Sequence, residues 1–151
     1  MGKRERLVAS SAIPVGLYGC AAQPPDGDTI DVARRHVHFA LHRGSRFCQL
    51  PLFFAVGVET WRADPGAVWV WKAVEAARLL ASSVGRAAFN ATLASHTEGP
   101  IAAVKATLAW AELDLKDMML CGVGSDVGVG LLGATKCALR GVVLKAIRRT
   151  F

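Results

Sequence analysis

The sequence predicts a mostly α-helical protein, an irregular bundle of four or five helices with a glycine-rich linker before the last helix. Three observations predict this fold class. Hydrophobic residues make up 52% of the 151 residues and charged residues 20%, so there is enough apolar material for a core and intrinsic disorder is excluded. Apolar residues recur at helical spacing in several segments. Strand signals are weak along the whole chain, whereas helix start and stop signals are strong.

The first helix is expected to end near Pro14, in a segment that opens with the basic residues Lys3 and Arg4. Residues 1–22 also have the outline of a secretory leader, because a basic start is followed by a short apolar stretch and small residues. Glu5 among the basic residues and Pro14 in the apolar stretch weaken that outline. We therefore expect an intracellular protein, nuclear or cytoplasmic, and keep a secreted or membrane-associated small helical protein as the alternative.

The mean hydropathy of +0.33 is high enough for a membrane protein to be considered. The longest stretch without charge covers residues 7–25 and contains Pro14, Pro24 and Pro25. A membrane-spanning helix needs about 20 predominantly apolar residues, and repeated prolines suit such a helix poorly. No stable membrane span is therefore expected.

A second helix is predicted for residues 29–43, after the turn signal at residues 24–27 and with Asp28 as its N-cap. Gly44 is expected to end it. Apolar and basic residues separate onto opposite faces at a period of 3.6 residues, as in an amphipathic helix. The apolar face is expected to hold Ile30, Ala33, Val37 and Leu41, and the basic face Arg34, Arg35, His38 and His42.

Two further helices begin at proline signals. Asp64 and Pro65 are typical of an N-cap and a first helical position. The helix predicted for residues 65–84 is apolar nearly all round, which requires burial against several neighbours. The Gly-Pro pair at residues 99–100 starts the next helix, in which apolar residues repeat at helical spacing as far as Leu115.

The last helix is predicted for residues 134–149, with its apolar residues facing the core. Residues 121–133 before it are glycine-rich and are interpreted as a flexible linker, so the chain divides into a helical region, 1–117, and a tail, 118–151. Within the linker, Gly128 to Gly133 match the G-x-G-x-x-G motif of dinucleotide sites. That motif needs a strand before it and an acidic residue about 20 residues later, and the chain offers no such acidic residue. No cofactor is expected.

The charge balance points to a polyanionic partner. Eighteen lysines and arginines face twelve aspartates and glutamates, which gives a formal net charge of +6. No carboxylate lies between Val32 and Val58, and the last helix carries none, so both segments are candidate phosphate-contacting surfaces, with a merely solvated surface as the alternative. The candidate nucleic-acid-binding residues are Arg34, Arg35, His38, His42, Arg43, Arg46, Arg140, Lys145, Arg148 and Arg149.

No catalytic or metal-binding residue is assigned. His38 and His42 are four residues apart and could share a metal on one helical face, but no nearby carboxylate completes or orients such a site. The four cysteines form no C-x-x-C pair and are interpreted as reduced thiols. Three of the four tryptophans lie on apolar helical stretches, so core packing is expected rather than stacking on bases.

The order of these features resembles one region of the LINE-type (non-LTR) retrotransposon reverse transcriptases. Residues 13–20, with the letters I-P-V-G-L-Y-G-C, are similar to the segment L-P-x-x-L-Y-G-C-E that follows the polymerase palm in this family, where the thumb begins. Ala21 stands where the family commonly has an acidic residue. A basic helix, the turn at residues 63–65 and the Gly-Pro pair follow in the family's order, so the resemblance covers about residues 4–115.

The resemblance implies a fragment that grips the backbone of RNA or DNA without sequence preference, with the missing polymerase palm as a further partner. It implies no catalysis by this chain. Polymerase chemistry needs paired carboxylates that hold two metal ions, and the sequence has no adjacent Asp-Asp pair. We therefore expect a non-catalytic protein without cofactor or metal.

Overall fold

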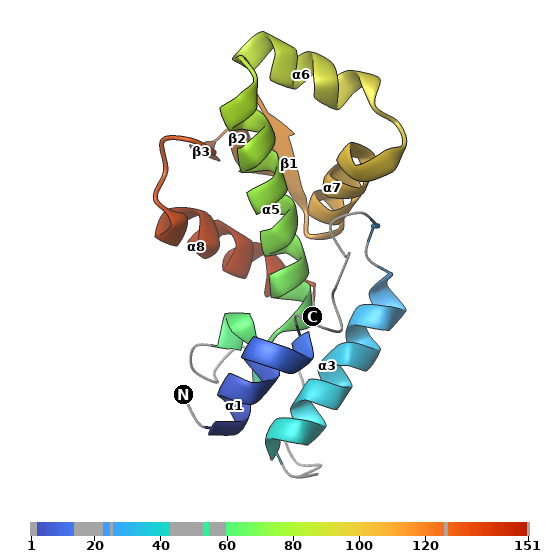
Figure 1. Ribbon diagram of the computed structural model, residues 1–151. Helices are drawn as coiled ribbons and strands as arrows, with labels where there is room; N and C mark the ends of the chain where they lie inside the picture. Colours follow the sequence, from blue (N-terminus) through green and yellow to red (C-terminus); the bar gives the residue numbers. More distant parts are fainter. Residues whose placement is uncertain are drawn as a thin grey trace.

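The computed structural model, shown in Figure 1, describes residues 3–13, 23–24, 26–42, 53–54, 60–125 and 127–150. Helices predominate, as expected, and a small antiparallel sheet accompanies them. The helices are α1 (Lys3–Leu7) with its π-helical continuation η1 (Val8–Ala12), α3 (Gly27–His42), η3 (Thr60–Arg62), α5 (Pro65–Ser83), α6 (Arg86–Ser95), α7 (Gly99–Trp110) and α8 (Lys136–Ile147). The strands are β1 (Leu113–Lys116), β2 (Met119–Gly122) and β3 (Gly128–Gly130).

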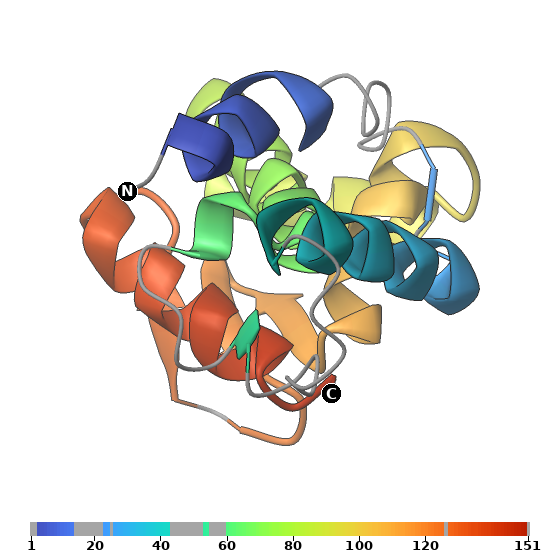
Figure 2. The same cartoon turned by 90° about the horizontal axis from the view of Figure 1, so that it is seen from below.

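Helix α5 is the centre of the fold, and α3, α6, α7, α8 and η3 all contact it (Figure 1). It begins as predicted, because the Asp64 side chain accepts a hydrogen bond of 3.0 Å from the Gly66 amide and Pro65 fills the first turn. Its tryptophans, valines and alanines are buried over most of its length, which confirms the expectation for an apolar helix. Seen from below in Figure 2, α3 and α8 lie on different sides of α5.

Helix α3 begins earlier than predicted. The capping side chain is that of Asp26, whose Oδ1 accepts from the Asp28 amide at 3.3 Å and whose Oδ2 accepts from the Thr29 hydroxyl at 2.8 Å. Asp28 itself lies inside the first helical turn, so the prediction of Asp28 as N-cap is wrong. Of the predicted apolar face, Ile30 and Val37 are buried and Leu41 is half-buried.

The helix predicted from residue 99 ends at Trp110, and Leu115 belongs to strand β1. The helical spacing that includes Leu115 is therefore coincidental. Helix α6 carries no side-chain cap at Gly85, so the sequence contains no start signal for it.

Strands β1 and β2 form a hairpin that the sequence did not reveal. Lys116 pairs with Met119, so the turn consists of Asp117 and Met118 alone. Both turn residues have positive φ, +53° and +61°, as a type I′ turn requires. Such turns usually carry Asn-Gly or Asp-Gly, and the absence of glycine here hid the signal. The hairpin pairs residues on both sides of position 117, the predicted boundary between the helical region and the tail.

The glycine-rich segment is part of the sheet, which corrects its interpretation as a plain linker. Gly128–Gly130 forms β3 and pairs with β2 in an antiparallel manner, and Leu131 directly after it is fully buried. A Cβ at Gly128 would overlap the Cys121 sulfur and lie 2.9 Å from the Leu120 carbonyl oxygen, so close strand packing requires glycine there. The first two glycines of the G-x-G-x-x-G letters therefore lie inside a short strand and the third in the turn between that strand and α8, whereas the dinucleotide motif needs its strand before the first glycine.

Helix α8 confirms most of the prediction for the last helix. The Thr135 hydroxyl accepts from the Ala138 amide at 3.2 Å and caps it. Its inward side chains are Leu139, Val143, Ala146 and Ile147, all buried, with Val142 packed at the edge of the core. Among the described residues, no helix is both long and apolar enough to cross a membrane.

Candidate nucleic-acid interface

Arg34, the first residue of the predicted basic face, is buried and serves the fold. Only 2% of its side chain is exposed. Its Nε donates a 3.0 Å hydrogen bond to Oδ1 of Asp64, and its Nη2 donates to Oδ2 of the same carboxylate at 3.4 Å. The carboxylate that caps α5 thus also holds the arginine of α3. Arg34 is unavailable to a phosphate, and its assignment as a nucleic-acid contact is wrong.

The surroundings of Arg34 explain its position. Nη2 also donates to the Thr150 hydroxyl at 3.3 Å, and the guanidinium carbon lies 5.9 Å from the centre of the Trp110 ring. A Cβ at Gly66 would lie 2.8 Å from Nη2 and 3.2 Å from Trp110, so only glycine leaves room for the guanidinium. In the described part of the chain, α3, the start of α5, the end of α7 and the end of α8 meet at this arginine.

The helical spacing of the apolar residues indicates that Arg34 is buried. Arg34 lies four residues after Ile30 and three before Val37, which places it on the apolar face rather than opposite it. An arginine at such a position requires a buried carboxylate partner. Asp64 is 30 residues away in sequence, and nothing local identifies it as that partner.

The other predicted residues of this segment have different positions. Arg35 is exposed, as expected. His38 is half-buried, and its ring packs edge-on against Phe53 with centroids 5.0 Å apart, so its prediction as an exposed residue is wrong. The side chain of His42 and all of Arg43 and Arg46 lie outside the described residues.

The basic residues of α8 do not share one face. Lys145 and Arg149 lie beside the β2–β3 connection, where they line a pocket of about 530 Å³, and Arg149 pairs with Glu112 at 3.7 Å. Arg148 is exposed. Arg140 lies on another side, packed against tryptophans, and is only half exposed. The single basic surface predicted for this helix is therefore divided between two sides.

Arg140 belongs to an arginine–tryptophan cluster that the sequence did not reveal. Its guanidinium carbon lies 4.6 Å from the ring centre of Trp61 and 5.1 Å from that of Trp71. The two indoles meet edge-to-face at 6.3 Å. Arg62 approaches Trp61 as well, at 5.3 Å. We name Trp61, Arg62, Trp71 and Arg140 the Arg/Trp cluster.

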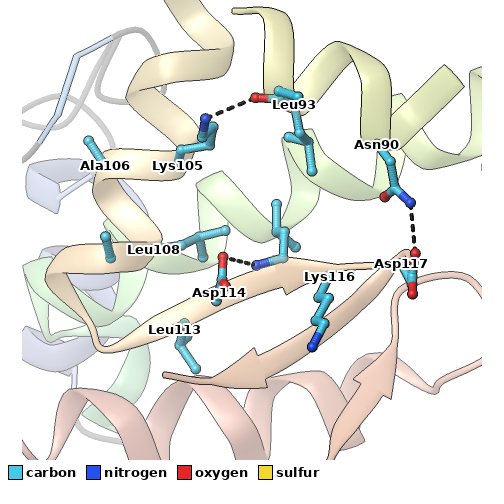
Figure 3. A pocket seen from close by; sticks show the side chains of 12 residues that line it. Asn90, Leu93, Lys105, Ala106, Leu108, Leu113, Asp114, Lys116 and Asp117 are labelled. Carbon is cyan, nitrogen blue, oxygen red and sulfur yellow. Dashed lines mark hydrogen bonds between the residues drawn. The ribbon is translucent and has the colours of Figure 1, made fainter. Parts of the chain in front are cut away.

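A further pocket of about 520 Å³ lies between α6, α7 and β1 (Figure 3). Several of its polar side chains bond to one another or to the backbone. Asn90 donates to Asp117 at 2.7 Å, and Lys105 donates to the Leu93 carbonyl at 2.9 Å, as the dashed lines in Figure 3 mark. Arg86 pairs with Asp117 at 3.4 Å. The contacts of Asn90 and Arg86 with Asp117 hold the non-glycine turn of the hairpin against α6, and the Lys105 bond joins α7 to α6, so these groups have a structural role.

The pocket in Figure 3 contains no serine, cysteine or histidine, so it offers no nucleophile–base pair of the usual kind. In the part of the chain that the structure describes, no group of three or more His, Cys, Asp or Glu side chains could hold a metal ion. Cys121 is buried and Cys137 is exposed.

Comparison with known proteins identifies no relative: no family model, no curated protein and no solved structure matches this chain.

Proposed function

We propose that this protein binds the phosphate backbone of RNA or DNA without base specificity and without catalysis. The observation that carries the proposal is the hydrogen bond of Arg34 to Thr150, which joins residues 116 positions apart. Arg35 follows Arg34, and Arg148 and Arg149 precede Thr150. Exposed cations from the two basic segments thus flank one junction between α3 and the end of α8.

Charge supports the same partner. Arg35 and Arg148 are exposed and have no ion-pair partner among the described residues, so phosphate contacts would not first have to break a salt bridge. The formal net charge of +6 favours association with a polyanion at long range. The resemblance of residues 4–115 to the thumb region of LINE-type reverse transcriptases implies the same class of partner, and a polymerase palm as a protein partner.

The test is a fluorescence-anisotropy titration with a labelled duplex at several salt concentrations. Each phosphate contact on duplex DNA contributes roughly −0.9 to the slope of log affinity against log salt concentration. Replacing Arg35 and Arg148 together by Gln should make the slope shallower by about 1.8 and weaken binding equally for unrelated sequences.

The matched control is Lys72→Gln, which removes an exposed cation that already pairs with Glu75 at 3.3 Å. This change should leave the slope nearly unchanged. Equal slopes for wild type and the double variant would mean that the junction is only a solvated surface. No binding by wild type at low salt would overturn the proposed function.

A further inference from the structure

The Arg/Trp cluster places two cations on one aromatic ring. The guanidinium carbons of Arg62 and Arg140 lie 5.3 Å and 4.6 Å from the centre of the same Trp61 ring. The ring comes from η3 and Arg140 from α8, so the cluster joins two segments far apart in sequence. Trp71 on α5 is 4% exposed and closes the inner side.

The cluster lacks a counter-charge. Neither Arg62 nor Arg140 has an ion pair with a carboxylate in the described part of the chain. The Nε atom of Arg140 is inaccessible to solvent and meets no hydrogen-bond acceptor there. Two like charges that approach the same ring without a counter-charge repel each other. An anion beside the partly exposed guanidinium of Arg140 would offset this repulsion.

The geometry selects the kind of anion. The guanidinium is a planar fork of donors that matches phosphate oxygens in pairs, whereas its face stacks on indole. Contacts with both Trp61 and Trp71 restrict the position of the Arg140 guanidinium, so less of its side-chain freedom is lost when an anion binds. Arg62 is exposed and supplies a second set of donors near the same ring.

We propose that Arg62 and Arg140, held on Trp61, form a binding site for a phosphoryl group. Where that group belongs to a nucleic acid strand, the site deepens the proposed function and rests on it, adding a phosphate contact apart from the α3–α8 junction. Where the group is free phosphate, the site stands independently of that function.

The probe is inorganic phosphate, titrated into the wild-type protein at constant ionic strength with sodium chloride as the exchanged salt. The indole N–H signal of Trp61, assigned with Trp61→Phe, is followed by NMR. We expect a saturable shift that chloride does not produce. Arg62→Gln should weaken phosphate binding roughly tenfold or more, because a hydrogen bond to a charged group is lost. Arg140→Lys keeps the positive charge but removes the paired donors of the guanidinium, so it should weaken phosphate binding as well.

Lys136→Gln is the matched control, since it removes one exposed cation one helical turn from Arg140 and leaves the cluster intact. Circular dichroism establishes that each variant folds, and Arg62, being exposed, can be replaced without disturbing the core. The proposal is overturned if phosphate moves the Trp61 signal no more than chloride does, or if Lys136→Gln weakens binding as much as Arg62→Gln.

A second arm uses a short labelled duplex in place of phosphate. Weaker duplex binding by Arg62→Gln than by Lys136→Gln would identify the phosphoryl group as part of a nucleic acid. If the duplex binds but Arg62→Gln has no effect on duplex or phosphate, the cluster proposal fails and the proposed function stands. If phosphate binds through the cluster but the duplex does not bind, the proposed function fails and the cluster stands.

Discussion

Arg34 and Arg140 are two arginines packed against tryptophan with opposite surroundings. Arg34 lies near Trp110 and is enclosed by the Asp64 carboxylate and the Thr150 hydroxyl, with 2% of its side chain exposed. Arg140 lies over Trp61 and Trp71, is half exposed and has no carboxylate partner among the described residues. The charge of Arg34 is neutralised by a carboxylate within the fold, whereas the charge of Arg140 has no such counter-charge among the described residues.

The presence or absence of a carboxylate partner is a way to distinguish structural arginines from binding arginines in a basic protein. Removing a charge from water is costly unless a counter-charge and hydrogen bonds replace the water. Asp64 can do this for Arg34 because it is itself fixed as the N-cap of α5. Indole faces attract the Arg140 cation but supply no hydrogen-bond acceptor for its donors. The presence of a fixed carboxylate, rather than burial alone, distinguishes the two.

The largest expected effect concerns Arg34. Arg34→Met leaves the Asp64 carboxylate buried without its cation, and breaking a buried pair from one side costs about 3–5 kcal/mol of unfolding free energy. Its neighbour Arg35 is exposed, so Arg35→Met should stay within about 0.5 kcal/mol of wild type. Urea denaturation followed by circular dichroism measures both. Equal stabilities of the two variants would show that the buried pair does not hold α3 to α5.

A smaller effect is expected at Gly66. The added methyl group of Gly66→Ala would lie 2.8 Å from Nη2 of Arg34, and overpacking of this kind costs about 1–3 kcal/mol. Gly141 on α8 is the control, because a Cβ there meets nothing within 4 Å. Gly141→Ala should stabilise the protein by up to about 1 kcal/mol through helix propensity. The thermal unfolding temperatures of the two variants should therefore shift in opposite directions. A Gly66→Ala variant more stable than wild type would contradict the close packing of Arg34 against Gly66.

The sequence predicts the helices that carry local signals. Asp64 and Pro65 start α5 where expected, and the apolar periodicity of α8 identifies its buried side. Prediction from sequence fails where a side chain contacts a residue that is distant in sequence, or where the local signal is atypical. Asp117 and Met118 make a hairpin turn without glycine, and the turn is supported by Asn90 and Arg86 of α6, which no short window connects to it.

The candidate site was predicted less completely than the fold. The run of basic residues favours one continuous surface, although helical spacing puts Arg34 on the apolar side next to Ile30 and Val37. The Arg/Trp cluster depends on residues 61, 62, 71 and 140, which only the packing of η3 and α8 on α5 brings together. Contacts between residues so far apart in sequence leave no periodic pattern, so they can be identified only from the structure.

The contrast between the two arginines can be measured in one experiment. The arginine Nε–Hε signals of the wild-type protein are recorded by NMR while inorganic phosphate is added at constant ionic strength. The Arg140 signal should move saturably, because phosphate bound beside its partly exposed guanidinium changes the surroundings of Nε, whereas the Arg34 signal should remain fixed by its 3.0 Å bond to Asp64. An Arg34 signal that moves as far as that of Arg140, or an Arg140 signal that does not move, would contradict the division between a structural and a binding arginine.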